Sequence, residues 1–301
     1  MFRKYTLVSF VLISLLLASC GPQNLVTATS TVSSAPALTL TSTPNVTPTL
    51  PSVTLAGTEL RSIQSKNTGR DYDIYILLPA DYAQRQGKTY PVLYVLDGQW
   101  DFKLYDSIYG GLHYDAFVPD MIIVGITYSG ANPDYEGLRA MDFTPVPAGY
   151  HPGSGDAPKF LSFIKDELTP LIESNYRVDP SRRILTGSSY AGLFTLYALF
   201  SDPSFFSGYI SASPAVTYGS FVIRDLEEAY FAQHQDLPVR LFVSVGGIED
   251  LNQPVQDFVQ IIQGRNYSDL IMESRVIEGE RHAGNKPEAF NRGLRFIFQS
   301  K

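Results

Sequence analysis

The chain has 301 residues, 44% of them hydrophobic and 13% aromatic, which is enough for one substantial core. Its formal net charge is −7 and no stretch is rich in Lys and Arg, which excludes a nucleic-acid-binding protein. Cys20 is the only cysteine, which excludes a disulfide within the chain.

The first twenty residues have the organisation of an export signal. A basic start is followed by an apolar run over residues 6–17 that is too short to span a bilayer comfortably. The run ends in LASC at residues 17–20, which resembles the bacterial lipobox, where a peptidase cuts before the cysteine and acyl chains are attached to it. We therefore expect residues 1–20 to be a lipoprotein signal peptide and Cys20 to be lipidated, with the rest of the chain extracytoplasmic and anchored to a bacterial cell membrane. A chance cysteine in a plain secretory signal is the alternative.

Residues 21–56 are rich in Ser, Thr, Pro and Ala and contain no charged residue. This composition lacks the apolar periodicity needed for packing and predicts a disordered tether. Patterns typical of strands and helices begin after it, so residues 57–301 are expected to form the folded domain.

The folded region opens with patterns typical of strands. Residues 59–66 and 72–78 predict two antiparallel strands joined by a tight turn. The apolar runs 90–96 and 121–127 predict strands buried on both faces, and residues 101–110 between them can form a helix. Together these segments predict a sheet that starts antiparallel and continues as a β-α-β unit.

Residues 129–158 are polar and rich in Gly, Pro and Tyr, and they contain no convincing strand, so we expect a long binding loop. The alternative, which we favour over direct catalysis, is that Arg139 and Asp142 pair to brace this loop, and His151 is interpreted as an ordinary loop histidine. Residues 159–176 predict an amphipathic helix that covers one side of the sheet. Candidate substrate contacts in and beside the loop are Tyr128, Tyr135, Arg139, Asp142, Tyr150 and His151.

A short apolar strand at 183–186 runs into the turn GSSYAG at 187–192 and then into an apolar helix that we expect from Leu193 onward. A sharp turn of the G-x-S-x-G type holds a serine hydroxyl at the carboxyl edge of a sheet, and the central serine here is Ser189. Ala191 stands where the last glycine is usual, and it is still small enough for a strand and helix that nearly touch. We expect the neighbouring Ser188 to face the same pocket. An ordinary Ser-capped helix after a Gly turn is the alternative.

The second half predicts parallel strands whose ends carry polar residues. The strand expected at 206–212 is followed by Ser-Pro-Ala, which we expect to line the pocket. A strand at 239–245 precedes a carboxylate-bearing turn and a helix at 254–263, and a strand at 271–277 precedes a histidine. If these strands run parallel to the strand before Ser189, the three groups converge in the order serine, acid, histidine.

A serine hydroxyl becomes a good nucleophile when an imidazole accepts its proton, and a carboxylate orients that imidazole. We assign Ser189 as the nucleophile and His282 as the base. Glu249 is the preferred acid, with Asp250 as the alternative. If both carboxylates are only surface charges, the serine and histidine would work as a dyad.

The expected oxyanion hole consists of the backbone N–H groups of Tyr190 and Gln99, the second of which follows an Asp-Gly turn at the end of a buried strand. An ordinary Asp-Gly turn is the alternative interpretation. Gly98, Trp100, Arg139 and Tyr135 are the predicted substrate-binding residues. The sequence shows neither a cluster of metal ligands nor a phosphate-binding loop, so no metal and no cofactor are expected.

From about residue 58 to 298 the chain resembles the putative esterase family of α/β-hydrolases within the esterase D superfamily, in particular its enterochelin-esterase-like and siderophore-esterase-like members. The resemblance lies in YPVLYVLDGQW at 90–100, RAMDFTP at 139–145, the segment 160–194 and GERHAG at 279–284. It implies an α/β-hydrolase fold over residues 57–301, with a mostly parallel central sheet and helices on both faces. It also implies serine ester hydrolysis through an acyl-enzyme. Family members commonly have a histidine before the nucleophile and two glycines after the following residue, where this chain has Ser188 and Ala191-Gly192.

The resemblance leaves the ester open among siderophore lactones, acyl esters of plant polymers and small acyl substrates, so the expected partner is a small-molecule or oligomeric ester. No protein partner can be named. The alternatives to hydrolysis are a catalytically inactive ligand-binding lipoprotein on a hydrolase fold and an acyltransferase.

Overall fold

The computed structural model describes residues 54–299. The expected signal peptide, the lipidation site Cys20 and most of the expected tether lie outside the described residues. In the part of the chain that is described, no helix is long and apolar enough to cross a membrane.

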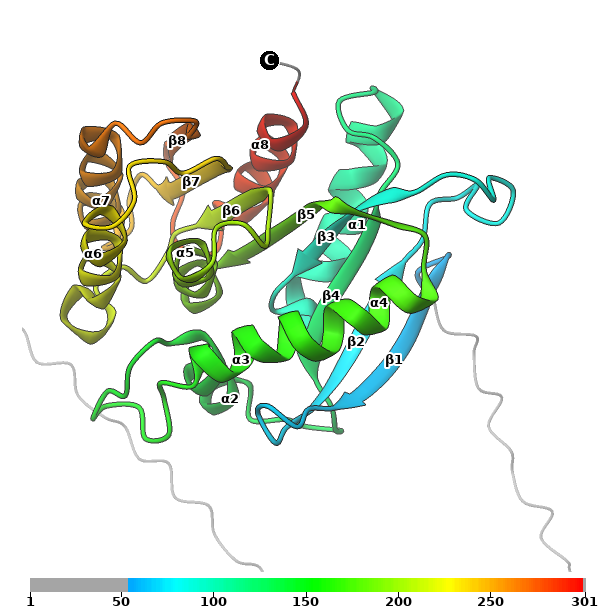
Figure 1. The fold of residues 1–301 in the computed structure, drawn as a ribbon, viewed down its shortest axis with the longest axis horizontal. Helices are drawn as coiled ribbons and strands as arrows, with labels where there is room; N and C mark the ends of the chain where they lie inside the picture. The colour runs from blue at the N-terminus through cyan, green and yellow to red at the C-terminus, as the bar shows by residue number, and fades with distance from the viewer. Residues whose placement is uncertain (1–53, 300–301) are drawn as a thin grey trace, which may run out of the picture. The chain divides into compact units, whose positions relative to one another are not determined.

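An eight-stranded sheet forms the centre of the structure, with the strand order β1-β2-β4-β3-β5-β6-β7-β8 (Figure 1). The first two strands pair antiparallel, β2 pairs antiparallel with β4, and all the remaining pairs are parallel. This confirms the mostly parallel sheet. The strands are β1 (Thr58–Gln64), β2 (Asp71–Leu77), β3 (Tyr90–Val95), β4 (Ile122–Tyr128), β5 (Val178–Ser188), β6 (Gly208–Ala212), β7 (Arg240–Gly246) and β8 (Ile271–Ile277).

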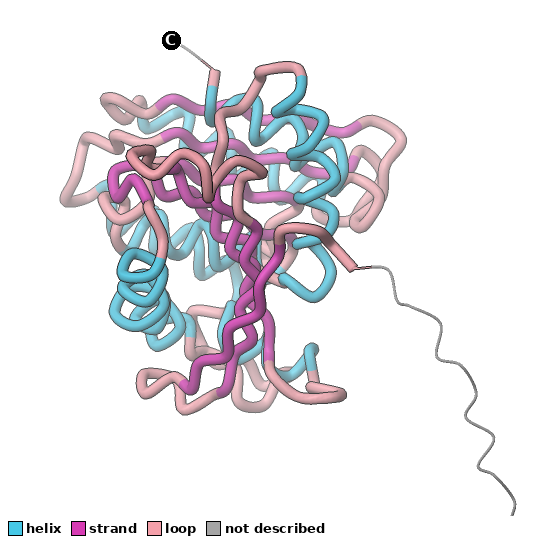
Figure 2. Tube along the Cα trace, turned by 90° about the vertical axis from the view of Figure 1, so that its right-hand side faces the viewer, coloured by secondary structure: helices cyan, strands magenta, loops and turns pink. Residues whose placement is uncertain are grey.

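Helices cover both faces of this sheet, as Figure 2 shows from the side. On one face α1 and α8 pack together, with the rings of Tyr105 and Phe290 stacked at 4.4 Å. The other face carries most of the remaining helices, where Phe160 meets Phe194 edge to face at 5.0 Å. The helices are α1 (Gly98–Tyr114), α2 (Tyr135–Phe143), α3 (Ala157–Phe163), the π-helical turn η1 (Ile164–Leu168), α4 (Thr169–Asn175), α5 (Tyr190–Ser201), α6 (Tyr218–Phe231), α7 (Asn252–Arg265) and α8 (Lys286–Phe298).

Two expectations about helices were wrong. The segment 129–158, expected to be a loop, contains α2, which begins where the Asp134 side chain accepts a hydrogen bond from the Gly137 N–H at 3.1 Å. A glycine in the first turn and few apolar residues hide this helix in the sequence. The helix after the serine turn begins at Tyr190 and not at Leu193, because the turn itself lasts only as far as Ser189.

The parallel arrangement of β5, β6, β7 and β8 brings their carboxyl ends to one edge of the sheet. The segments that follow these strands therefore lie along this edge. Because β3 pairs with β5, the turn after β3 reaches the same edge beside Ser189.

Candidate active site

Ser189 lies in the sharp turn between β5 and α5, with φ of 63° and ψ of −120°. A positive φ is uncommon for a residue with a side chain and marks a strained turn. A Cβ added at Gly187 would lie 2.6 Å from backbone and side-chain atoms of Ala191, so only glycine fits there. The fully buried Ala191 fits the other side of the turn. The turn thus needs a glycine at its first position and tolerates alanine at its last.

Backbone hydrogen bonds hold Ser189 in this conformation. Its N–H donates to the carbonyl of Ala212 at 3.0 Å, and its own carbonyl accepts from the N–H groups of Leu193 and Ala215 at 2.9 and 3.1 Å. The segment after β6 thus lies against the turn, at the edge expected for it. Ser188 does not face a pocket, because it is 1% exposed and its hydroxyl has no hydrogen-bond partner within residues 54–299. This corrects the expectation for Ser188: the residue ends β5, and its side chain points away from solvent.

The structure brings His282 and Glu249 together. Nδ1 of His282 lies 2.6 Å from Oε2 of Glu249, whose side chain is 4% exposed. The other carboxylate oxygen, Oε1, accepts hydrogen bonds from the Ser213 hydroxyl and the Gly246 N–H, both at 2.5 Å. Asp250 is exposed and makes no hydrogen bond to the imidazole within residues 54–299. Of the two acidic candidates in the described residues, therefore, only Glu249 is hydrogen-bonded to the histidine.

The segment carrying His282 turns back over the neighbouring strands. A Cβ at Gly246 would lie 2.5 Å from the carbonyl oxygen of Glu280, so this segment crosses directly over the end of β7. Further along, Nζ of Lys286 binds both carboxylate oxygens of Asp101 in α1, at 2.9 and 3.1 Å. The histidine is thereby drawn from β8 toward the middle of the sheet edge. Within the described residues, no hydrogen bond joins its imidazole to the Ser189 hydroxyl.

The two backbone N–H groups predicted for an oxyanion hole both lie at helix starts. Tyr190 is the first residue of α5 and Gln99 the second of α1, so neither N–H has an acceptor within its helix. Helix N-termini also carry a partial positive charge, which favours an anion. Gly98 packs closely on β4, because an added Cβ would lie 3.0 Å from backbone atoms of Gly125 and Ile126. Gly98 is therefore placed to shape this turn by close packing.

Arg139 of α2 pairs with Asp97, the residue before this helix start. Its Nε and one terminal nitrogen bind the two carboxylate oxygens at 2.6 and 2.8 Å. Burial disfavours the charged guanidinium, yet Asp97 raises the pKa of Arg139 above its usual value. The expectation that Arg139 pairs with Asp142 was therefore wrong, because the two side chains leave α2 toward different partners.

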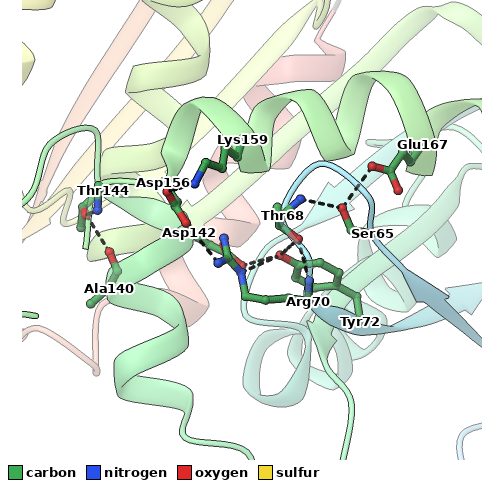
Figure 3. A network of polar contacts seen from close by, with 11 residues as sticks. Ser65, Thr68, Arg70, Tyr72, Ala140, Asp142, Thr144, Asp156, Lys159 and Glu167 are labelled. Carbon is green, nitrogen blue, oxygen red and sulfur yellow. Dashed lines mark hydrogen bonds and ion pairs between the residues drawn. The ribbon is translucent and has the colours of Figure 1, made fainter. Parts of the chain in front are cut away.

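Asp142 belongs to a separate buried network (Figure 3). Its carboxylate binds Arg70 and accepts a hydrogen bond from the Tyr72 hydroxyl at 2.8 Å, and Arg70 also reaches Asp156 at 3.1 Å. Burial raises the pKa of Asp142 to about 6, although Arg70 opposes this shift. The network joins the β1–β2 turn to α2 and to the start of α3. It fixes α2, and it leaves Asp142 fully buried and out of reach of a substrate.

Aromatic residues surround the serine turn. The rings of Trp100 and Tyr135 lie 5.5 Å apart, and the Arg139 guanidinium lies 5.2 Å from the Trp100 ring and 5.9 Å from that of Tyr190. Trp100, Tyr135 and Arg139, three of the four predicted substrate-binding residues, thus lie together beside Tyr190. By contrast, Tyr128 is buried, with its ring 5.6 Å from the Tyr72 ring.

His151 lies in the loop between α2 and α3, as expected, and its imidazole contacts the first residue of α5. Its Nε2 lies 2.8 Å from the Tyr190 hydroxyl, and the rings of Tyr150 and Tyr218 pack on the same pair. No periodic pattern in the sequence indicated this contact, because His151 and Tyr190 are 39 residues apart. Its single signal was the abundance of aromatic residues in that segment.

Comparisons with known proteins agree with this architecture. The family model described as "Putative esterase" matches residues 65–263. The ferri-bacillibactin esterase of Bacillus subtilis strain 168 is 29% identical over 81% of this chain and 90% of its own length. The siderophore triacetylfusarinine C esterase of Aspergillus fumigatus is 31% identical over 60% of this chain and 65% of its own length. A solved structure of the BES protein from Bacillus cereus superposes with a TM-score of 0.74 and 28% identity, covering 85% of this chain and all of that one.

Proposed function

Since the chain belongs to the putative esterase family of α/β-hydrolases and is a carboxylic ester hydrolase, we propose that hydrolysis proceeds through an acyl-enzyme on Ser189. In this mechanism the Ser189 hydroxyl attacks the ester carbonyl and His282 accepts its proton. The histidine then gives that proton to the departing alkoxide. A water molecule, activated by the same histidine, releases the acid and restores the serine.

The carboxylate and the helix starts stabilise the charges that form in this reaction. Glu249 holds the Nδ1 proton of His282 and stabilises the imidazolium as it forms. The N–H groups of Tyr190 and Gln99 receive the oxyanion of the tetrahedral intermediate, where one such donor is typically worth about 10²–10³ in rate. Catalytic hydrogen bonds are often long before substrate binds. The serine-to-histidine contact is therefore expected to form in the substrate complex.

The single observation that carries this proposal is the 2.6 Å contact between His282 and the buried Glu249 on the sheet edge that also holds the strained Ser189 turn. The direct test compares Ser189→Ala with Ser188→Ala in turnover of p-nitrophenyl acetate. The first variant should lose about 10³-fold or more in kcat. The second should keep most of its activity, because the Ser188 hydroxyl is buried and lacks a partner among the described residues. Retained turnover in Ser189→Ala would contradict the proposal.

We further propose that the substrate is an ester of the siderophore type. Support comes from the printed names of the relatives, which include esterases of ferri-bacillibactin and triacetylfusarinine C. The aromatic surface of Trp100, Tyr135 and Tyr190 suits aryl or planar amide groups, which stack on such rings. The charge of Arg139 is already paired with Asp97, so recognition through ring contacts fits the site better than recognition by this cation.

A hydrolysis panel tests the substrate. Purified protein is given ferric and iron-free siderophore esters, feruloyl sugars and short acyl esters, and the products are identified by mass spectrometry. The highest kcat/KM should be found for a siderophore ester, whereas a preference for feruloyl sugars would contradict this assignment. Including an alcohol acceptor in each reaction separates hydrolysis from acyl transfer, because transfer gives a new ester in place of the free acid.

We propose in addition that the protein is exported and lipid-anchored through Cys20, as the LASC run at residues 17–20 indicates. In a bacterial host, the unaltered chain should incorporate radiolabelled fatty acid and sediment with membranes. Cys20→Ala should lose the label and the membrane association together. Label retained by Cys20→Ala would contradict the proposed anchor.

A further inference from the structure

The Glu249 carboxylate is part of a closed ring of hydrogen bonds. Oε2 faces Nδ1 of His282, and Oε1 accepts from the Ser213 hydroxyl at 2.5 Å. The Ser213 oxygen in turn accepts a hydrogen bond from Nδ2 of Asn285 at 2.7 Å. The same amide nitrogen donates to the carbonyl of His282 at 2.8 Å, which closes the ring. Four residues from three strand-end segments thus form one connected polar unit.

Ser213 occupies an unusual position for this contact. It follows β6, is fully buried and has φ of 41°, which is rare for a residue with a side chain. Its N–H donates to the carbonyl of Ser244 at 2.7 Å, and this bond helps to hold the strained turn. Glycine would adopt this backbone conformation without penalty. The serine therefore keeps a strained backbone and at the same time directs its hydroxyl at the buried carboxylate.

Asn285 is likewise fully buried, at the start of α8. Its Nδ2 faces three acceptors, namely the Ser213 hydroxyl and the carbonyls of Arg281 and His282. Its Oδ1 has no donor among the described residues. A buried oxygen without a partner is unfavourable. The amide nevertheless keeps this orientation, because it turns Nδ2, the donor, toward the three acceptors.

We infer that Ser213 and Asn285 are positioning residues of the ester hydrolysis. Ser213 fixes the carboxylate of Glu249, and Asn285 fixes both that hydroxyl and the backbone of His282. This inference rests on the proposed roles of Ser189, Glu249 and His282. Neither residue is placed to touch the substrate. Their effect is to keep the carboxylate and the imidazole in one geometry before substrate binds, as outer hydrogen-bond partners do at other catalytic sites.

The test variant for the first residue is Ser213→Gly. It removes the hydroxyl while relieving the backbone, so folding should be preserved. We expect kcat to fall about 10- to 100-fold, the rate equivalent of one lost hydrogen bond to a charged group, with KM nearly unchanged. The downfield NMR resonance of the His282 Nδ1 proton should also shift or broaden. Wild-type kcat together with an unchanged resonance would overturn the inference.

Ser244→Ala is the matched control. Ser244 is also buried, and its hydroxyl has no hydrogen-bond partner within residues 54–299, so the same loss of a buried hydroxyl should leave kcat and the resonance unchanged. Equal losses in Ser213→Gly and Ser244→Ala would overturn the inference.

Asn285→Asp tests the second residue, because it replaces the donor with an acceptor of the same shape and should lower kcat more than Ser213→Gly does. The combined variant Ser213→Gly/Asn285→Asp should lose clearly less than the product of the two single losses, since both changes break one unit. A combined loss in kcat equal to the product of the two single losses would show that Ser213 and Asn285 act independently, and it would overturn the inference that they form one unit.

Parallel assay of Ser189→Ala separates this inference from the mechanism on which it rests. Activity in Ser189→Ala contradicts the proposed acyl-enzyme. An inactive Ser189→Ala beside a Ser213→Gly with unchanged kcat and an unchanged resonance contradicts only the positioning role.

Discussion

Ser188 and Ser189 are chemically identical neighbours, and the fold alone separates them. Ser188 ends a buried strand with its hydroxyl enclosed, whereas Ser189 has φ of 63° and is half-buried at the sheet edge. A backbone strain of this kind is typically of order 1–3 kcal/mol and persists only where surrounding contacts hold it. Here the hydrogen bonds to Ala212, Leu193 and Ala215 supply those contacts. The strain thus places one serine side chain, and not its neighbour, at the edge where the histidine segment arrives.

Glu249, whose carboxylate contacts His282, is the second residue on which the proposed mechanism depends. Glu249→Gln keeps the shape of the side chain but removes the charge that stabilises the imidazolium in the proposed mechanism. We expect kcat to fall by about 10³–10⁴, as in the corresponding change in other triads, with little change in KM. Steady-state kinetics on p-nitrophenyl acetate measures both quantities.

Asp250→Asn is the control for this prediction, because Asp250 is the adjacent carboxylate and is exposed. Its kcat should stay near that of the unaltered protein. A large loss of kcat in Asp250→Asn with no loss in Glu249→Gln would identify Asp250 as the acid. No loss in either variant would leave a dyad of serine and histidine.

At the scale of elements, α2 carries Arg139 to the helix start that holds Gln99, and the buried ion pair of Asp142 with Arg70 fixes α2 in turn (Figure 3). Removing one member of a buried pair leaves an uncompensated charge. The position of α2 should therefore depend on Arg70, which lies 72 residues away in the sequence.

Arg70→Leu should lower the free energy of unfolding by about 3–5 kcal/mol at pH 7. The loss should be smaller at pH 5. Burial raises the pKa of Asp142 to about 6 even beside the arginine, and the loss of Arg70 removes an effect that lowers this pKa. At pH 5 the carboxyl of the variant is therefore protonated, and the buried charge has disappeared. Urea denaturation at both pH values measures the difference.

Arg61→Leu is a control at an exposed pair, because Arg61 and Glu59 have side chains that are 50% and 39% exposed. Such pairs contribute about 0–1 kcal/mol, so this variant should unfold nearly as the unaltered protein does. A loss in Arg70→Leu no greater than in Arg61→Leu would contradict the role of the buried network.

The sequence was sufficient for most elements but not for α2 or for the connections between elements. Strands β3 and β4 are continuous apolar runs, so burial on both faces was readable from composition. Helix α2 was missed because its stability comes from tertiary contacts, including the ion pairs of Arg139 and Asp142, and not from its own propensity. The same holds at the site. Ser189, His282 and Glu249 follow from chain order after strands, whereas the hydrogen bond of Asn285 to Ser213 joins residues 72 positions apart and leaves no local pattern.

At the scale of the whole molecule, buried carboxyls set the dependence of stability on pH. Burial raises the pKa of both Asp101 and Asp142 to about 6, against the opposing effects of Lys286 and Arg70. In the unfolded chain such carboxyls titrate near about 4. Between these values the folded protein binds more protons than the unfolded chain does, so the stability that these groups contribute is complete below about pH 4 and is lost as pH rises through about 6.

The melting temperature should therefore be higher at pH 5 than at pH 7. Below about pH 4 it should fall again. The pKa values of Asp120, Asp156 and Asp202 are lowered, since hydrogen bonds from lysines outweigh the effect of burial, and their contribution is lost when they are protonated. Differential scanning calorimetry at constant ionic strength measures this profile.

Asp142→Asn should reduce the difference in melting temperature between pH 5 and pH 7, whereas Asp166→Asn, at an exposed residue, should leave this difference unchanged. A melting temperature that falls steadily from pH 7 to pH 5 would contradict this assignment.

The parallel strands β5 to β8 explain how residues separated along the chain meet at one edge, and the serine nucleophile is the central claim built on that arrangement. Its most direct test is treatment of the purified protein with a fluorophosphonate, followed by peptide mass spectrometry with fragmentation that distinguishes the adjacent serines. Only an activated hydroxyl reacts readily with this reagent, so we expect a single adduct on Ser189. An adduct on Ser188, or a protein that remains unlabelled while it hydrolyses esters, would contradict it.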